Sequence, residues 1–178
     1  RNITKARVYS PNSGHSQNFV DEMKGFSSVP QDLEAVDTPE EAVTNADIIC
    51  AATTSSTPVL RYQDLKSGVH INGVGSFQPS MQEIDSETIR NALVFVDSRE
   101  SALSETGDLT IPIQEGIIGK NHLRAEIGEL LENPSLGRKT PDEITFFKSC
   151  GVAVQDVVAA GMALEQAKKH NLGRIIRM

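Results

Sequence analysis

The chain has no tryptophan, few aromatic residues and no excess of basic residues. It contains 178 residues, of which 4% are aromatic, and its formal net charge at pH 7 is -7. Nucleic acids are bound by concentrated Lys and Arg, which this acidic chain lacks. No apolar run approaches the roughly 20 residues that span a bilayer, and no signal-like apolar segment is visible. We therefore expect a cytoplasmic protein that binds neither nucleic acid nor membrane.

Cysteine and histidine are also scarce. Cys50 and Cys150 have no C-x-x-C partner and fall at expected strand positions, so we predict buried free thiols rather than a disulfide or a metal pair. The four histidines show neither H-x-x-x-H nor H-E-x-x-H spacing, so no metal site is expected. His70 is expected to have its hydrogen bonds satisfied within a strand.

Short apolar runs alternate with helical patterns along the chain. Expected strands cover residues 5–10, 33–36, 48–52, 69–73, 93–96 and 144–147. Those at 48–52, 69–73 and 93–96 are continuous apolar runs, as is typical of parallel strands covered on both faces. Helices are expected at residues 16–24, 39–45, 125–131 and 152–170. Thr38 is the expected N-cap of the second helix and Pro39 its first residue. The alternation predicts an α/β fold, a Rossmann-like parallel sheet with flanking helices and a C-terminal helix.

A glycine-rich phosphate-binding turn is missing. A dinucleotide-binding sheet normally opens with a strand followed by G-x-G-x-x-G/A, whose backbone N–H groups and helix N-terminus bind the pyrophosphate. No such motif precedes the strand expected at residues 5–10. We therefore expect the chain to lack the first βα unit and to be the C-terminal half of a longer enzyme.

Three of the expected strands end in glycine or hydroxyl residues. Gly73, Gly75 and Ser76 end the apolar run at residues 69–73, Thr53 follows the run at 48–52, and Ser149 follows the last strand. Cofactors of open α/β sheets bind at the carboxyl ends of the strands, where glycine lets the backbone approach a flat ligand. An ordinary strand-to-helix loop is the alternative interpretation.

Four motifs resemble those of the ornithine cyclodeaminase/mu-crystallin family. They are A-D-I-I-x-x-x-T at residues 46–53, H-x-N-x-V-G at 70–75, V-D-S-R-E at 96–100 and F-K-S-x-G-x-A-x-x-D at 147–156. The resemblance implies that a preceding half carries the glycine-rich turn, the basic residues that bind the substrate carboxylate and much of a homodimer interface. Residues 1–115 would then be a Rossmann-like dinucleotide-binding domain, incomplete at its N-terminus. Residues 116–178 would be the rest of the cofactor domain and a helix that returns toward the substrate domain.

The same resemblance implies a set of cofactor contacts. Thr53, with Thr54 beside it, would bind the cofactor's phosphate or ribose, and Ser149 would approach the nicotinamide amide. The nicotinamide side of the cleft would be lined by Ile71, Asn72, Gly73, Val74 and Gly75. Thr53 could instead form a Ser/Thr turn with its own backbone, and Ser149 could be a helix N-cap.

Other residues of these motifs need no functional explanation. Asp97 or Ser98 is expected to cap a helix that runs toward Leu103, and Lys148 to end a strand. Glu126 and Glu129 suit an exposed helix face.

The end of the strand at residues 5–10 bears on the choice of cofactor. NAD-selective enzymes carry an acidic residue there, which binds the ribose 2′-hydroxyl and repels a 2′-phosphate. Ser10 occupies this position and is followed by Asn12 and Ser13, although no arginine follows to bind a phosphate. We predict a preference for NADPH, with NADH possible.

The segment after Gly75 departs from the family pattern. Family cyclodeaminases resemble V-G-x-D-x-P-G-K here, whereas Phe77 stands in place of the Asp and Met81 in place of the Lys. A phenyl ring cannot accept a proton, and a positioned general base contributes about 10²–10⁴ in rate. Catalytic residues are therefore not assigned. Phe77 would pack against the apolar ring of a substrate, with Gln78 and Cys150 nearby, or else would belong to the core.

These features favour an NAD(P)H-dependent reductase of small cyclic ketimines. Reduction of a preformed imine needs a hydride, a grip on the carboxylate and one proton. The V-G-S-F-x-P pattern at residues 74–79 resembles that of family members that reduce such ketimines, and this resemblance implies Δ1-pyrroline-2-carboxylate or Δ1-piperideine-2-carboxylate as the imino-acid substrate. The alternatives are an ornithine cyclodeaminase, which forms proline and ammonia with NAD, and a non-catalytic dinucleotide-binding homologue.

Overall fold

The computed structural model describes residues 2–26, 28–174 and 176. In chain order the elements are β1 (Lys5–Val8), α1 (Ser13–Met23), β2 (Asp32–Ala35), α2 (Pro39–Val43), β3 (Ile48–Ala51), β4 (His70–Gly73), α3 (Ser86–Asn91), β5 (Leu93–Val96), α4 (Arg99–Glu105), α5 (Gly107–Gln114), β6 (Leu123–Glu126), α6 (Ile127–Glu132), β7 (Thr145–Lys148) and α7 (Ala153–Lys169). Short 3-10 turns lie at Tyr62–Asp64, Lys120–His122 and Pro134–Leu136.

The main sheet has five parallel strands in the order β3-β4-β7-β5-β6. Ala51 pairs with Gly73, Gly73 with Lys148 and Lys148 with Val96, so the last residues of four strands lie in register. Their carboxyl ends therefore meet at one edge of the sheet. The expected α/β fold is confirmed. β7 lies between β4 and β5, so residues on both sides of position 115 share this sheet, and the domain boundary drawn there stays a prediction.

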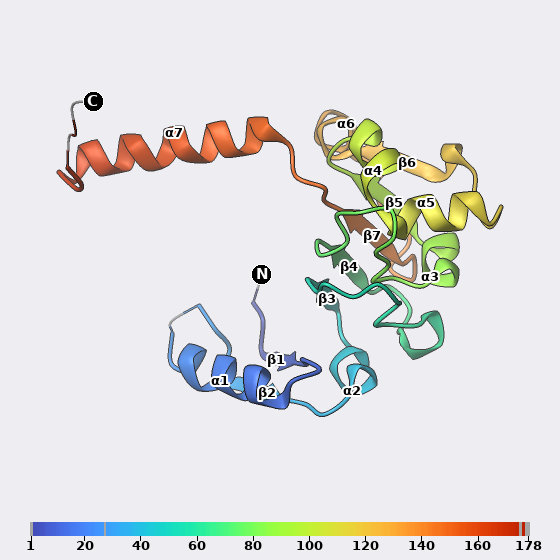
Figure 1. Cartoon of the computed structure of the whole chain (residues 1–178), viewed down its shortest axis with the longest axis horizontal. Helices are drawn as coiled ribbons and strands as arrows, with labels where there is room; N and C mark the ends of the chain where they lie inside the picture. The colour runs from blue at the N-terminus through green and yellow to red at the C-terminus, as the bar shows by residue number, and fades with distance from the viewer. Residues whose placement is uncertain (1, 27, 175, 177–178) are drawn as a thin grey trace.

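β1 and β2 form a second, two-stranded parallel sheet. Figure 1 shows this pair with α1 and α2 below the main sheet. Arg7 of β1 connects the pair to α2, because its guanidinium donates to the backbone carbonyl oxygens of Glu41 and Thr44. Thr38 caps α2 by accepting from the backbone N–H of Glu41, and Pro39 is its first residue, as expected.

The core lies around β4, β5 and β7. Ile71, Val94, Val96 and Phe146 are fully buried there. β3 differs from the expectation of strands covered on both faces, because Ile48 is 41% exposed and Cys50 is exposed while Ile49 and Ala51 are buried. Both cysteines are free, but neither is fully buried as expected, because Cys150 is half-buried and Cys50 is exposed. Its side chain lies on the face of β3 that the described residues leave uncovered.

Three segments differ from the sequence expectation. Ser86–Asn91 is a helix, α3, where none was expected. Gly107–Gln114 is a helix, α5, although Pro112 lies inside it. Thr106 caps α5 and Leu109 is fully buried, so tertiary packing outweighs the loop signals of Gly and Pro. Residues 123–126 form strand β6, so the first two residues of the helix expected at 125–131 belong to a strand, and the helix itself begins at Ile127.

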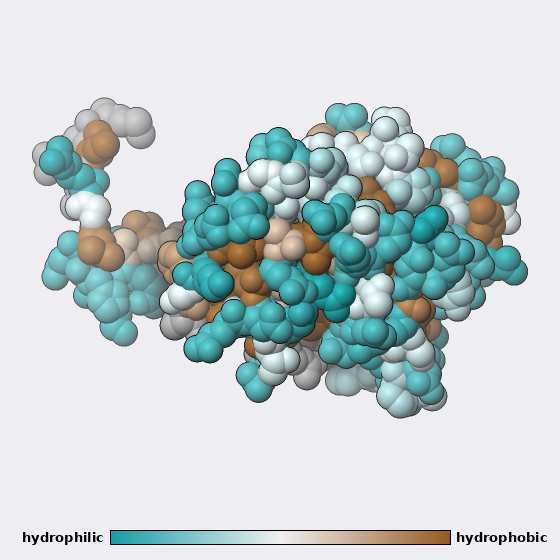
Figure 2. All heavy atoms as spheres, turned by 90° about the horizontal axis from the view of Figure 1, so that it is seen from below, coloured by the Kyte–Doolittle hydropathy of each residue, from teal (hydrophilic) through white to brown (hydrophobic). Residues whose placement is uncertain are grey.

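α7 follows the expected span but stands away from the sheet. Figures 1 and 2 show it as an arm that extends from the body of the molecule. Its apolar side chains are exposed, among them Val154, Val157, Val158, Met162 and Leu164. Its length and its apolar residues match the prediction, while its expected return toward a substrate domain stays a prediction.

Candidate functional site

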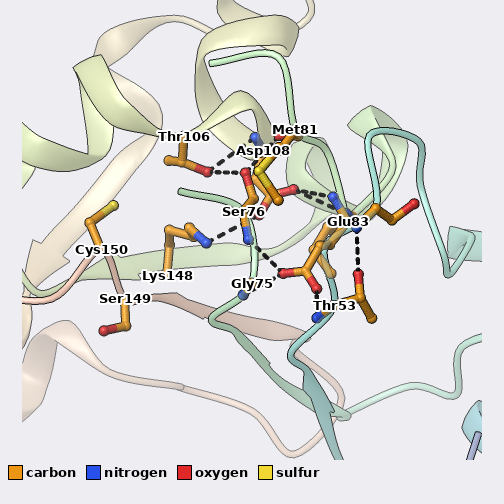
Figure 3. Close-up of polar contacts among 12 residues, drawn as sticks. Thr53, Gly75, Ser76, Met81, Glu83, Thr106, Asp108, Lys148, Ser149 and Cys150 are labelled. Carbon is orange, nitrogen blue, oxygen red and sulfur yellow. Dashed lines mark hydrogen bonds and ion pairs between the residues drawn. The ribbon is translucent and has the colours of Figure 1, made fainter. Parts of the chain in front are cut away.

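The carboxyl edge of the main sheet carries a cluster of buried and half-buried polar groups. Thr53 follows β3, Gly75 and Ser76 follow β4, and Ser149 follows β7. The register of the strands brings these turns together, and Figure 3 shows their side chains around Glu83 and Lys148. Three of the four turn residues were expected to contact a cofactor. Two acidic residues beneath these turns, Glu83 and Asp108, were not expected to belong to the site.

Glu83 joins the ends of β3 and β4. Its side chain is fully buried, and its two carboxylate oxygens accept from the backbone N–H groups of Thr53 (2.5 Å), Gly75 (2.7 Å) and Ser76 (2.9 Å). Hydrogen bonds to an ionised acceptor are roughly twice as strong as neutral ones. Sequence reasoning missed Glu83 because an acidic residue in a polar loop carries no sign of burial.

The two glycines near the end of β4 are explained by internal packing. A Cβ on Gly75 would fall on the backbone of Thr53 and 2.5 Å from the Glu83 carboxylate. A Cβ on Gly73 would lie 2.7 Å from the ring of Phe146. Packing alone therefore requires both glycines, and their approach to a flat ligand stays a prediction. Contact of the cofactor with Thr54, Ile71, Asn72 and Val74 also stays a prediction.

The Thr53 hydroxyl oxygen accepts from the backbone N–H of Ser55 at 3.1 Å. This is the local turn that was the alternative to a cofactor contact. A hydroxyl still has one hydrogen to donate after accepting one bond, so the turn leaves Thr53 able to bind a ligand oxygen.

Asp97 organises the turn after β7. One of its carboxylate oxygens accepts from the Ser149 hydroxyl (3.0 Å) and from the backbone N–H groups of Cys150 (2.9 Å) and Gly151 (2.8 Å). Gly151 has a φ of 80°, which favours glycine. Ser149 is not a helix N-cap, because α7 begins at Ala153 and Val152 takes that position. Ser98, not Asp97, caps α4.

Lys148 and Asp108 form a buried ion pair below these turns. Both side chains are fully buried, and the Lys148 ammonium nitrogen lies 3.4 Å from an Asp108 carboxylate oxygen. The other Asp108 oxygen accepts from the backbone N–H groups of Glu83 (2.7 Å) and Ile84 (3.1 Å). Burial raises the pKa of Asp108, and Lys148 opposes that rise. Lys148 was expected only to end a strand. The structure shows that it is also part of a buried polar network.

The loop between β4 and Glu83 exposes apolar surface. Phe77 is 57% exposed and Val74 is 52% exposed, so the suggestion that Phe77 belongs to the core is wrong. Gln78 is exposed as well. Cys150 is half-buried, and burial raises the pKa of its thiol to about 11, so it is protonated at neutral pH. Contact of Phe77, Gln78 and Cys150 with a substrate stays a prediction.

The residues expected to select the cofactor lie at the end of β1, in the smaller sheet. Asn12 caps α1 by accepting from the backbone N–H of Gly14 at 3.0 Å, and Ser13 begins that helix. Tyr9 and Pro11, on either side of Ser10, line a cavity of about 310 Å³ that also touches the N-terminus of α2 and residues 58–61. No strand hydrogen bonds join β1 to β3 in the described chain, so these residues belong to a different sheet from the strands that carry the Glu83 cluster.

His70 is satisfied within its strand, as expected. Its ring nitrogens lie 2.8 Å from the Thr145 hydroxyl and 3.3 Å from the Asn72 side-chain oxygen. Burial lowers the pKa of His70. The helices that the structure describes include none long and apolar enough to cross a membrane.

Glu126 and Glu129 do more than cover an exposed helix face. They form a capping box at the start of α6, and Glu129 pairs with Arg99 of α4 at 2.5 Å. Hydrogen bonding to Arg99 lowers the pKa of Glu129. The V-D-S-R-E motif therefore has a structural role at three of its residues, Asp97, Ser98 and Arg99.

Known proteins are similar to this chain over most of its length. The model of the ornithine cyclodeaminase/mu-crystallin family matches residues 1–171. A Δ1-pyrroline-2-carboxylate reductase of Bacillus cereus is 47% identical over 137 residues, which are 76% of this chain and 42% of that protein. The structure of the Thermococcus litoralis Δ1-pyrroline-2-carboxylate reductase in complex with NADH and L-proline is 38% identical and has a TM-score of 0.93, covering 99% of this chain and 54% of the other.

An archaeal alanine dehydrogenase dimer with bound NAD is similar in structure as well. It is 30% identical, has a TM-score of 0.87, and covers 100% of this chain and 54% of the other. The chain thus spans about half the length of the relatives that it matches.

Proposed function

The chain belongs to the ornithine cyclodeaminase/mu-crystallin family, and on that premise we propose that the complete protein reduces small cyclic ketimines with NADH or NADPH. Δ1-Pyrroline-2-carboxylate is the substrate that the similar reductases indicate, with Δ1-piperideine-2-carboxylate as a larger homologue. Reduction of the first would yield proline. The proposal is carried by Phe77, which presents an apolar ring at the position where the cyclodeaminase pattern has an acid.

The acidic residues nearest to this edge support reduction over cyclodeamination. Glu83 holds three donors and Asp97 four, and Asp108 is paired with Lys148 and two backbone N–H groups. A general base needs a free lone pair within reach of the substrate proton. These three carboxylates are already engaged in holding the protein together. Imine reduction needs one proton at nitrogen, which we assign to water or to another part of the complete protein.

The strand ends fit the nicotinamide and its ribose better than a pyrophosphate. The backbone N–H groups of Thr53, of residues 74–76 and of residues 149–151 are all taken by protein acceptors. A phosphate needs such groups free. The hydroxyls of Thr53 and Ser149 and the apolar surface of Val74 suit a ribose and a flat neutral ring. When bound, the nicotinamide would supply the hydride.

We place the adenosine end of the cofactor near the end of β1. The cavity beside Tyr9 and Pro11 has room for a base, and Ser10 stands where an NAD-selective enzyme carries an acid. Neutral groups at Ser10, Asn12 and Ser13 would tolerate a 2′-phosphate, so we propose that NADPH is preferred. The homologous structures hold NADH and NAD, and both cofactors belong in the tests. A homodimer is proposed by analogy with the dimeric alanine dehydrogenase.

Isotope transfer tests the proposed reaction. The complete protein is given Δ1-pyrroline-2-carboxylate and a reduced cofactor deuterated at C4 of the nicotinamide on either face. Mass spectrometry should find deuterium at the α-carbon of proline with one of the two faces. Cofactor oxidation without labelled proline, or no oxidation at all, would refute imine reduction.

A further inference from the structure

At the edge of the sheet, Glu83 collects three hydrogen-bond donors and Asp97 collects four, the fourth being the backbone N–H of Ser98, all from the turns that follow the strands. Glu83 accepts from the backbone of Thr53, Gly75 and Ser76. Asp97 accepts from the Ser149 hydroxyl and from the backbone of Cys150 and Gly151. The first carboxylate thus ties β3 to β4, and the second ties β5 to the turn after β7.

Burial of the Glu83 carboxylate costs free energy, and this cost is understandable if Glu83 fixes the geometry of the surrounding turns. Its side chain is fully buried, and the ion pairs among the described residues do not include it. The nearby buried ammonium of Lys148 is paired with Asp108 instead. A buried charge is tolerated only when hydrogen bonds replace its lost water. Here that replacement comes from N–H groups of two separate turns, so the turns and the carboxylate hold each other in place.

Close packing makes this arrangement intolerant of displacement. Gly75 runs so near to Thr53 that no Cβ fits between their backbones. Glu83 bonds the N–H groups of both residues, so it sets the separation of the two turns. Asp97 has a comparable effect on Ser149, because the Ser149 hydroxyl hydrogen points to Asp97 and only its lone pairs remain for a ligand.

We propose that Glu83 and Asp97 are positioning residues that hold these turns in a cofactor-ready shape before the cofactor binds. The proposal rests on the proposed function in one respect, that the nicotinamide end of a dinucleotide lies over this edge. Preorganised groups bind more tightly because less order has to be created on binding. Loss of either carboxylate should therefore weaken cofactor binding without touching the cofactor itself.

The test uses Glu83→Gln and Asp97→Asn in the complete protein. Each variant keeps the size of the side chain but replaces a charged acceptor by an amide whose NH₂ group faces other donors. The control is Glu143→Gln, because Glu143 also accepts from two backbone N–H groups, those of Lys139 and Thr140, but lies before β7, at the opposite end of that strand. Binding of NADH and of NADPH is measured by nucleotide fluorescence, and folding by circular dichroism and thermal unfolding.

Amide hydrogen exchange without cofactor supplies the second readout. We expect faster exchange at Thr53, Gly75 and Ser76 in Glu83→Gln, and at Cys150 and Gly151 in Asp97→Asn. The dissociation constant for NADH should rise about tenfold in each variant, the effect of losing one charged hydrogen bond, and stay within about twofold in the control. Unchanged NADH affinity in a folded variant would overturn the proposal, even with a lower unfolding temperature.

The same samples separate this proposal from the proposed reaction. A wild-type protein that binds NADH but does not reduce Δ1-pyrroline-2-carboxylate would refute the reaction, and the affinities of the variants would still decide the role of the carboxylates. A wild-type protein that binds neither NADPH nor NADH would overturn the positioning role itself. If Glu83→Gln fails to fold, Asp97→Asn decides the outcome, because Asp97 is only partly buried.

Discussion

Replacement of Lys148 by Met should destabilise the protein strongly at neutral pH and much less in mild acid. Lys148→Met removes the cation that lies 3.4 Å from Asp108 and leaves a fully buried carboxylate without a charged partner. Breaking a buried pair in this way typically costs about 3–5 kcal/mol. The expected result is a loss of this size at pH 7, measured by urea unfolding of the complete protein.

The pH dependence follows from the direction of the Asp108 pKa. Burial already raises this pKa, and loss of Lys148 removes the main effect that opposes the rise. A carboxyl group whose pKa is raised by folding is most favourable below its unfolded pKa of about 3.9, and stability is lost as the pH rises through the folded value. Protonating Asp108 in the folded variant costs about 1.4 kcal/mol for each pH unit above 3.9, hence about 4 kcal/mol at pH 7 and about 1.5 kcal/mol at pH 5.

A double variant controls for lost packing. Lys148→Met combined with Asp108→Asn keeps an oxygen for the backbone N–H groups of Glu83 and Ile84 and removes the uncompensated charge. It should be more stable at pH 7 than Lys148→Met alone, and its stability should change little between pH 5 and pH 7. A loss below about 1 kcal/mol in Lys148→Met, or a loss that is equal at both pH values, would refute the reasoning about the buried pair.

Three further predictions concern single residues. Gly75→Ala should lower the free energy of unfolding by about 1–3 kcal/mol or more, because its Cβ would overlap the neighbouring backbone. Gly128→Ala is the control, because a Cβ there meets open space. If Gly75→Ala leaves thermal unfolding unchanged, the close packing around Gly75 is contradicted. Iodoacetamide at pH 7 should modify exposed Cys50 before half-buried Cys150, whose thiol pKa is about 11, and peptide mass spectrometry that found Cys150 modified first would contradict this. Ser10→Asp should shift the ratio of kcat/KM values from NADPH toward NADH, and an unchanged ratio would show that Ser10 does not face the ribose.

The strands could be predicted because their signals are local. The apolar run at residues 93–96 became β5 with the same bounds, and Thr38 with Pro39 marked the start of α2. Strand β6 was missed, and its residues 125–126 were assigned to a helix, because Leu123 and Ala125 are buried as an edge strand through pairing with β5, a contact between distant residues. α5 was missed because its stability comes from the burial of Leu109 rather than from helix-forming residues.

The candidate site was only half visible in the sequence. Thr53, Gly75 and Ser149 could be placed at strand ends from the motifs and the apolar runs before them. Glu83 and Asp108 could not, because an acidic side chain becomes a buried acceptor only when several turns converge on it in space. Lys148 ends an apolar strand, and its burial follows from the position of Asp108.

A direct comparison of two substrates tests the central claim, that this family member reduces imines and lacks the acid that cyclodeamination needs. The complete protein is assayed with Δ1-pyrroline-2-carboxylate and NADPH or NADH, and in parallel with ornithine and NAD⁺, by cofactor absorbance, ammonia release and proline formation. Stoichiometric cofactor oxidation with the imine, and little or no ammonia from ornithine, is the predicted result. Conversion of ornithine to proline and ammonia with catalytic NAD⁺, as fast as the imine is reduced, would contradict it.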